Sequence, residues 1–149
     1  MSQRLSRRAE DYLRIIYEII ENRGYVRVKD ISMMLGVRPP TAVGMLRKLH
    51  QQGLIIYEKY GGITLTARGR EIAEAVKKRH DIFIKFLEIL SVPEEIALED
   101  AHVLEHQLHP VTVRQIAKFV EFLTRASETG YPKFATRFLE AFRHYCSKE

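Results

Sequence analysis

The sequence lacks the features of secreted, membrane-spanning and disulfide-stabilised proteins. Cys146 is the only cysteine among 149 residues, which excludes an intramolecular disulfide and a zinc knuckle built from thiolates. No apolar run approaches the roughly 20 residues that a helix needs to cross a membrane. Residues 1–12 lack the apolar core of a signal peptide. These absences predict a soluble protein of the cytoplasm.

The sequence does contain an uneven distribution of charge. Residues 1–80 hold 16 lysine and arginine residues against 8 aspartate and glutamate residues, a net charge of +8. Residues 81–149 hold 8 against 11, a net charge of −3. A basic first half joined to a mildly acidic second half suggests that the first half binds a polyanion. Basic residues that only solvate helix surfaces would produce the same count.

The hydrophobic periodicity of the first half predicts a winged helix-turn-helix. Apolar residues recur at helical spacing in three segments, residues 7–22, 28–35 and 41–52. Pro39 and Pro40 suit the first turn of the third helix. The β-branched runs 54–58 and 63–66 flank a Lys-Tyr-Gly-Gly turn and predict a hairpin, the wing. We place this domain at residues 1–73; a helical domain with an incidental hairpin is the alternative.

The second half is predicted to be α-helical, so the expected fold class is mainly α. Thr66 can cap a long helix, interrupted only by Gly69, that ends before Pro93. Further helices are expected at residues 94–108, 111–123 and 133–145. Their aromatic residues form broad apolar faces, which could be buried internally or against a second copy of the chain. We assign residues 74–149 to this helical domain.

The predicted recognition helix and wing carry candidate DNA contacts. Thr41 can hydrogen-bond a base, Val43 can touch a thymine methyl group, and Gly44 lets the backbone approach closely. Basic residues farther along suit phosphate contacts. The full candidate set is Arg27, Arg38, Pro39, Pro40, Thr41, Val43, Gly44, Arg47, Lys48, Lys59 and Tyr60. One domain of this size reads few base pairs, so we expect a homodimer on a two-fold symmetric double-stranded DNA operator.

The segment His102-Val-Leu-Glu-His106 carries three potential metal ligands at helical spacings i, i+3 and i+4, on one face. Two imidazoles and a carboxylate suit transition metals, and His80 could complete the set. The same five residues match the H-x-x-E-H signature of one class of zinc protease, with Glu105 as general base. A third interpretation leaves the histidines structural and gives the helical domain an organic effector. The residues alone leave these alternatives open.

The order of these parts resembles the diphtheria toxin repressor family, and above all its short branch, the manganese transport regulators. The likeness covers essentially the whole chain. It lies in E-D-Y-L (10–13), the R-P-P-T start of the recognition helix, the segment 57–73, the K-K-R-H run (77–80) and the E-H pair at 105–106. The resemblance implies a metal-activated repressor of metal-homeostasis genes. It also implies that the metal binds between the first helix and the dimerisation domain.

The resemblance further implies a ligand set. The ligands of the family fall on Asp11, His80, Glu105 and His106. The position three residues before that glutamate is itself a glutamate in manganese regulators and a cysteine in the toxin-repressor branch. In this chain it is His102. An added imidazole favours Fe²⁺, Co²⁺ or Zn²⁺ over Mn²⁺ relative to an all-oxygen site. The expected cofactor is therefore a divalent transition metal ion: Mn²⁺, Fe²⁺ or Zn²⁺.

Two departures from the family pattern bear on how many ions bind. Arg14 stands where manganese regulators have a second first-helix carboxylate, and a guanidinium repels a second cation unless it turns outward to solvent. Ile84 and Leu98 occupy the carboxylate and histidine positions of the accessory site of the toxin-repressor branch. We therefore expect one ion per protomer.

Overall fold

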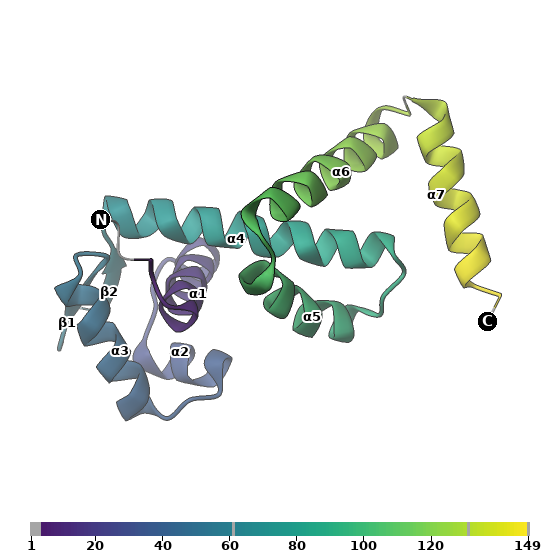
Figure 1. Cartoon of the computed structure of the whole chain (residues 1–149). Coiled ribbons are helices and arrows are strands. Elements are labelled where there is room, and N and C mark those ends of the chain that lie inside the picture. The colour runs from purple at the N-terminus through teal and green to yellow at the C-terminus, as the bar shows by residue number, and fades with distance from the viewer. Residues whose placement is uncertain (1–3, 61, 131, 149) are drawn as a thin grey trace. The chain divides into compact units, whose positions relative to one another are not determined.

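The computed structural model describes residues 4–60, 62–130 and 132–148, and helices dominate it (Figure 1). The chain divides into two compact units, Met1–Lys77 and Lys78–Glu149, which we call unit 1 and unit 2. This division lies four residues beyond the domain boundary expected after residue 73, and it falls inside one long helix. The predicted boundary itself stays a prediction.

Unit 1 has the element order of a winged helix-turn-helix, as the periodicity predicts. Among its described residues, the elements are α1 (Arg7–Arg23), α2 (Val28–Leu35), α3 (Pro39–Gln51), β1 (Ile55–Glu58), β2 (Gly62–Leu65) and the first turns of α4 (Ala67–Ile89). The two strands pair antiparallel, with Ile55 opposite Leu65 and Glu58 opposite Gly62. Gly61, in the predicted turn, lies outside the described residues.

Local interactions account for the ends of the first two helices. Ser6 caps α1 by accepting a hydrogen bond from the Ala9 amide at 3.1 Å. Gly24 ends α1 with a φ of +83°, a left-handed conformation that glycine adopts without a Cβ penalty. At the start of α2, the Asp30 carboxylate accepts a hydrogen bond from the Arg27 amide at 3.0 Å. Asp30 also pairs with Arg23, whose guanidinium lowers the pKa of that carboxyl group.

The core of unit 1 is built from apolar side chains that recur at helical spacing. Its fully buried members come from the three helices and the start of the hairpin: Leu13, Ile16, Ile31, Leu46, Leu49, Leu54 and Ile55. Burial of one such side chain stabilises the fold by about 1.5–3 kcal/mol relative to its exposure to water. The opposite face of α3, which includes Thr41, Gly44 and Arg47, is exposed.

The junction of the wing with α4 depends on Thr66 and Gly69. The Thr66 hydroxyl caps α4 by accepting from the Gly69 amide at 3.1 Å, and it donates to the Gly53 carbonyl at 2.7 Å. A Cβ atom built on Gly69 would lie 1.7 Å from the Leu54 carbonyl oxygen. The glycine that looks like an interruption in the sequence is therefore the residue that lets α4 approach the backbone of the wing.

Among its described residues, unit 2 contains only helices and the short turns that connect them. It contains the second part of α4, α5 (Glu94–Gln107), α6 (Pro110–Thr129) and α7 (Lys133–Cys146). Phe83 and Leu87 of α4 pack with Ala97 and Ala101 of α5. A separate cluster joins α6 to α7: Leu123, Ala126, Ala135 and Leu139. The α4–α5 pair positions the histidine motif, because Ala97 and Ala101 lie on the same helix as His102.

Several aromatic side chains of α6 and α7 lie outside these cores. Phe119 and Phe122 are each 46% exposed, Phe138 is 60% exposed, and Phe134 is 67% exposed. Burial of these rings within one chain, one of the two alternatives the sequence left open, is therefore incomplete for these four residues. None of the helices in the described part of the chain is long and apolar enough to cross a membrane.

Candidate metal centre

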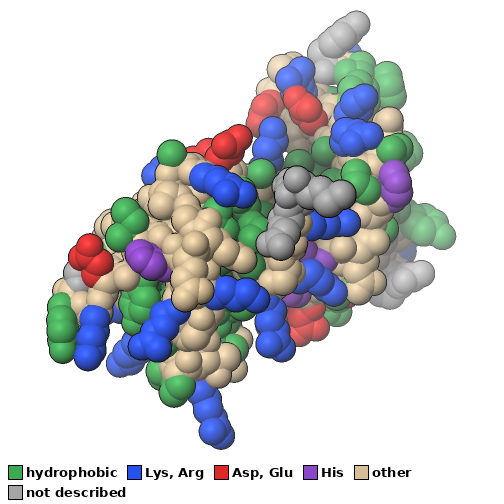
Figure 2. All heavy atoms as spheres, turned by 60° about the vertical axis from the view of Figure 1, so that its left-hand side comes forward, with side chains coloured by type: hydrophobic (Ala, Val, Ile, Leu, Met, Phe, Trp, Pro, Cys, Tyr) green, Lys and Arg blue, Asp and Glu red, His purple; other side chains and the backbone are tan. Residues whose placement is uncertain are grey.

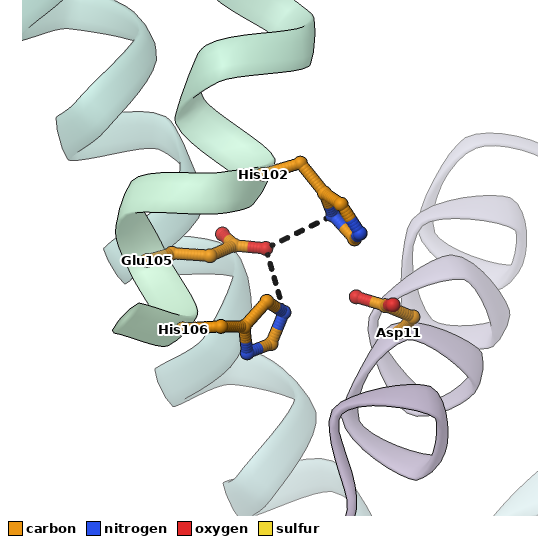
Figure 3. Close-up of side chains that lie close together, drawn as sticks. All are labelled: Asp11, His102, Glu105 and His106. Atoms are coloured by element: carbon orange, nitrogen blue, oxygen red, sulfur yellow. Dashed lines mark ion pairs between the residues drawn. The ribbon is translucent and has the colours of Figure 1, made fainter. Parts of the chain in front are cut away.

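Three side chains with metal-binding chemistry meet on one face of α5. His102, Glu105 and His106 stand at i, i+3 and i+4, and Figure 3 shows the Glu105 carboxylate directed between the two imidazole rings. Oε1 of Glu105 lies 3.1 Å from Nε2 of His106 and 3.4 Å from Nδ1 of His102. The ring centroids of the two histidines are 5.3 Å apart, in an edge-to-face arrangement. The geometry brings these three predicted ligands together.

The three α5 residues differ in how far their side chains are buried. The side chains of Glu105 and His106 are 0% and 2% exposed, whereas that of His102 is 43% exposed. An ionised carboxylate is stable in a protein interior only with charged or hydrogen-bonding partners. One carboxylate oxygen facing two imidazole nitrogens is also a donor set that borderline transition metals accept. The residues present therefore fit a divalent transition metal ion, with His102 at the solvent edge.

His80 contacts the same glutamate from another side. Its Nδ1 atom lies 2.9 Å from Oε2 of Glu105, the oxygen that does not face the α5 histidines. The His80 side chain is 9% exposed and projects from α4, in unit 2. His80 is thus placed beside the predicted ligands, but against the far oxygen of the carboxylate.

The two predicted first-helix positions both lie on α1, in unit 1. Asp11, labelled in Figure 3, is 7% exposed, and its role as a ligand stays a prediction. Arg14 does not turn outward, because its side chain is only 12% exposed and its Nη1 atom donates to Oε1 of Glu18 at 3.0 Å. Lys77 lies 3.7 Å from the same Glu18 oxygen. Glu18, which the sequence reasoning missed, is the acidic partner of Arg14, at the ordinary i, i+4 spacing of a helical ion pair.

Four further residues lie outside the α5 cluster: Ile84, Leu98 and two histidines that do not belong to the predicted ligand set. Ile84 packs partly buried against the Phe83 cluster, and Leu98 is 46% exposed; neither side chain offers a metal ligand. His50 accepts a hydrogen bond from the Tyr57 amide at 3.1 Å, and His109 accepts one from the Val111 amide at 3.1 Å. These two histidines therefore have structural partners outside the α5 cluster.

The predicted DNA contacts of unit 1 lie at its surface. All members of that set are exposed except Val43, which is half-buried. Arg38 directly precedes α3, whose first turn contains Pro39 and Pro40. At the wing, Tyr60 is 93% exposed and the Lys59 ammonium lies 5.6 Å from the centre of its ring. Lys and Arg side chains (blue) are prominent on the face of unit 1 turned toward the viewer in Figure 2.

Comparison with known proteins decides among the alternatives. Residues 4–63 match the family model of the iron dependent repressor N-terminal DNA binding domain, and residues 66–134 match that of the iron dependent repressor metal binding and dimerisation domain. The chain belongs to the iron-dependent repressor family. It is 38% identical over 119 residues to the HTH-type transcriptional regulator MntR of Bacillus pumilus, covering 80% of this chain and 83% of that protein.

Other relatives agree with this assignment. MntR of Bacillus subtilis (strain 168) is 38% identical over 113 residues, which are 76% of this chain and 80% of that protein. A solved manganese-dependent transcriptional repressor complex with manganese superimposes with a TM-score of 0.69 at 32% identity. ScaR with bound Zn²⁺ superimposes with a TM-score of 0.61 at 29% identity. This chain is covered to 76% in both comparisons, and it spans about half the length of those structures, 53% and 54%.

Membership of the iron-dependent repressor family settles the class of function. The chain is a metal-dependent, DNA-binding transcriptional repressor with a dimerisation domain, as the resemblance to the manganese-regulator branch implied. It is not an enzyme, so the interpretation of HVLEH as the helix of a zinc protease is wrong. The alternative of an organic effector with purely structural histidines finds no support among these relatives.

Proposed function

We propose that this iron-dependent repressor family member is activated by one divalent transition metal ion per protomer, held by Asp11, His102, Glu105 and His106. The observation that carries the proposal is the buried Glu105 carboxylate, whose Oε1 atom faces two imidazole nitrogens at 3.1 and 3.4 Å. Asp11 would add a second carboxylate from α1. The ion would supply a positive charge that joins ligands of the two units.

The ligand set bears on which metal is bound. One relative is described as manganese-dependent and another was solved with Zn²⁺. We propose Mn²⁺, Fe²⁺ or Zn²⁺ as the effector of this chain. Two imidazoles shift the preference toward Fe²⁺, Co²⁺ or Zn²⁺ relative to a set made of oxygen ligands, because imidazole is the softer ligand.

A single ion per protomer is proposed on the basis of Arg14. Arg14 stands three residues after Asp11, on the same side of α1. Its guanidinium pairs with Glu18 while 88% of its side chain is buried. A fixed positive charge beside Asp11 disfavours a second cation there by Coulomb repulsion. Elemental analysis that found a reproducible two ions per chain would contradict this proposal.

The proposed mechanism is linkage between metal binding and DNA binding. Asp11 belongs to unit 1, and the other three ligands belong to unit 2. Ligands on both units would favour one relative orientation of the units, and so one separation of the two recognition helices of a dimer. Such coupling is typically worth about 1–3 kcal/mol. The loaded homodimer would bind a two-fold DNA operator of metal-homeostasis genes in the cytoplasm.

The proposed DNA contacts follow the exposed face of α3 and the wing. Thr41, Val43 and Gly44 would face base edges, with Arg38, Pro39 and Pro40 at the entry of the helix. The remaining members of the set would contact phosphates: Arg27, Arg47, Lys48, Lys59 and Tyr60. Their exposure supports this assignment.

The test uses His106→Ala in a metal titration of DNA binding, followed by fluorescence anisotropy. The DNA is a duplex selected from random sequence by the metal-loaded wild-type protein. We expect chelation to weaken wild-type binding, added metal to restore it, and His106→Ala to lose the metal response while keeping its helical circular dichroism. His144→Ala is the matched control, because His144 is an exposed histidine of α7. A normal metal response of His106→Ala would overturn the site assignment.

A further inference from the structure

A hollow on the surface of unit 1 has a basic rim. Its volume is about 480 Å³, within the range of sites that bind small organic ligands. Three exposed cationic side chains line it: Arg4, which precedes α1, Lys48 of α3 and Arg68 of α4. No acidic side chain lines it in the part of the chain that the structure describes. A hollow lined by charge of one sign concentrates the electric field and attracts ions of the opposite sign.

The three cationic side chains make no ion pair with another described residue. Arg70, two residues after Arg68 on the same helix, differs in this respect. Its guanidinium pairs with Glu21 at 2.6 Å and with Glu74 at 3.1 Å. Like charges that converge on one hollow repel each other unless an anion lies between them. The hollow therefore offers three cations to an anionic ligand.

The amino-terminal end of α1 contributes to the same hollow. Ser6, the N-cap of α1, and Ala9, in its first turn, both line it. The first amides of a helix have no carbonyl partner within the helix, and the Ser6 hydroxyl accepts from only one of them, the Ala9 amide. The positive end of the helix dipole favours an anion at this place. The backbone of α1 thus adds to the attraction of the three side chains.

The floor of the hollow is apolar. Leu54, which is 1% exposed, and the half-buried Leu5 line it beside Ala9. A basic rim over an apolar floor suits a ligand that joins an anionic group to an apolar part, as the phosphate and deoxyribose of DNA do. Free phosphate has no apolar surface and would use only the rim. The lining therefore favours a phosphate that is attached to a larger group.

The position of the hollow along α3 connects it with the proposed DNA-binding face. Thr41, Gly44, Lys48 and Gln52 stand at i, i+3, i+7 and i+11, which places them along one side of α3. Lys48 lies about 10 Å from Thr41 along the helix axis, because each residue rises 1.5 Å. The major groove is about 12 Å wide, so a helix whose amino end meets base edges brings its carboxyl end to the bordering phosphates. DNA is therefore the favoured source of the phosphate.

We infer that this hollow binds a phosphate group and that the backbone of the DNA operator supplies it. The phosphate lies among Arg4, Lys48 and Arg68, and the deoxyribose contacts Leu54. Arg4 and Arg68 are thus DNA contacts in addition to the set proposed above. The inference rests on the proposed function, because it takes the Thr41 side of α3 as the side that faces DNA.

The first test measures the salt dependence of DNA binding by the metal-loaded, full-length protein. Arg68→Gln should reduce the slope of log affinity against log salt concentration by about 0.9, the value for the loss of one cationic contact with phosphate. Arg4→Gln should act in the same direction. Arg70→Gln is the matched control on the same helix and should leave the slope unchanged, because its guanidinium is already paired with Glu21 and Glu74.

The second test locates the phosphate on the DNA. Duplexes of the selected sequence, each with one neutral methylphosphonate in place of a phosphate, are compared for binding to the wild type and to Arg68→Gln. We expect a position at which the neutral linkage weakens wild-type binding but leaves the binding of Arg68→Gln unchanged. Equal losses in both proteins at every position would overturn the assignment of the hollow to the DNA backbone.

The third test examines a free phosphate as the source. Pyrophosphate is titrated into the metal-free, full-length protein at constant ionic strength and followed by calorimetry. Binding that Arg68→Gln loses, together with unchanged salt slopes, would assign the hollow to a free phosphate ligand in place of DNA. Unchanged slopes without pyrophosphate binding would overturn the inference altogether. Failure of the proposed contacts of α3 is seen separately, as unchanged DNA affinity in Thr41→Val.

Discussion

At the scale of single residues, His102 differs from its two neighbours in the cluster. It is the only one of the three α5 side chains with substantial exposure, and it stands where the resemblance to manganese regulators expects a carboxylate. An imidazole at this position removes a negative charge and adds a softer ligand. For the ligand set proposed above, we therefore expect the choice of metal to depend on this one side chain more than on Glu105 or His106.

Replacement of His102 by glutamate tests this dependence. We expect His102→Glu to shift the ratio of the dissociation constants for Zn²⁺ and Mn²⁺ by about tenfold in favour of Mn²⁺, which corresponds to about 1.4 kcal/mol. Competition titrations with a chromophoric chelator measure both constants. His144→Glu adds the same charge to an exposed histidine of α7 and serves as the control. An unchanged ratio in His102→Glu would show that residue 102 does not select the metal.

At the scale of secondary-structure elements, the start of α4 lies in close contact with the backbone that leads into the wing. The Leu54 carbonyl oxygen occupies the space that a Cβ on Gly69 would need, at 1.7 Å. The neighbouring Thr66 hydroxyl bonds both Gly53 and the Gly69 amide. The wing and the long helix are therefore joined by backbone contacts that tolerate no side chain at residue 69.

A pair of glycine substitutions tests this constraint. Gly69→Ala should lower the free energy of unfolding by about 3 kcal/mol, because the added methyl group forces backbone atoms apart. Gly44→Ala is the matched control, since its Cβ would meet nothing within 4 Å in the middle of α3. That control should raise the free energy of unfolding by up to about 1 kcal/mol, the helix propensity gained over glycine. Urea denaturation of both variants measures the difference, and equal values would contradict the close approach.

The helices and the wing could be predicted from the sequence because their apolar spacing and their glycine and proline residues are local signals. The carboxyl end of α6 could not be predicted in this way. The sequence predicts an end at residue 123, yet the helix continues to Thr129. The added residues include Ala126, which is completely buried with Leu123 in the cluster that joins α6 to α7. A single small residue adds little to a hydrophobic pattern, so the pattern does not show where the helix ends.

The candidate site could be predicted only in part, for a similar reason. The spacing of His102, Glu105 and His106 is local and predicts a shared face. The oxygen that His80 contacts depends on how α4 packs on α5 through Phe83 and Ala101, which no sequence motif specifies. The Arg14–Glu18 pair was likewise missed, although its i, i+4 spacing was available as a signal.

At the scale of the whole molecule, the two halves of the chain differ in charge, +8 for residues 1–80 and −3 for residues 81–149. The DNA-binding domain of the family falls in the positive half, at residues 4–63. Each phosphate that a cationic side chain neutralises releases condensed counterions from DNA. DNA binding by the repressor is therefore expected to weaken steeply as salt is added.

The salt dependence gives a direct count of phosphate contacts. Arg47→Gln should reduce the slope of log affinity against log salt concentration by about 0.9, since one phosphate contact is lost. Arg125→Gln is the control, because Arg125 is an exposed arginine of unit 2 that pairs with Glu121. Anisotropy titrations at several salt concentrations measure both slopes. An unchanged slope in Arg47→Gln would remove this residue from the proposed DNA contacts.

For an ion held as proposed, the exposure of His102 also determines the side from which the ion exchanges with solvent. A chelator arriving from solvent meets this imidazole first, while Glu105 and His106 remain enclosed by protein. Release can then begin with the swing of one ring, without unwinding a turn of α5. Loss of the ion, and with it release of the operator, would then require no unfolding of the protein.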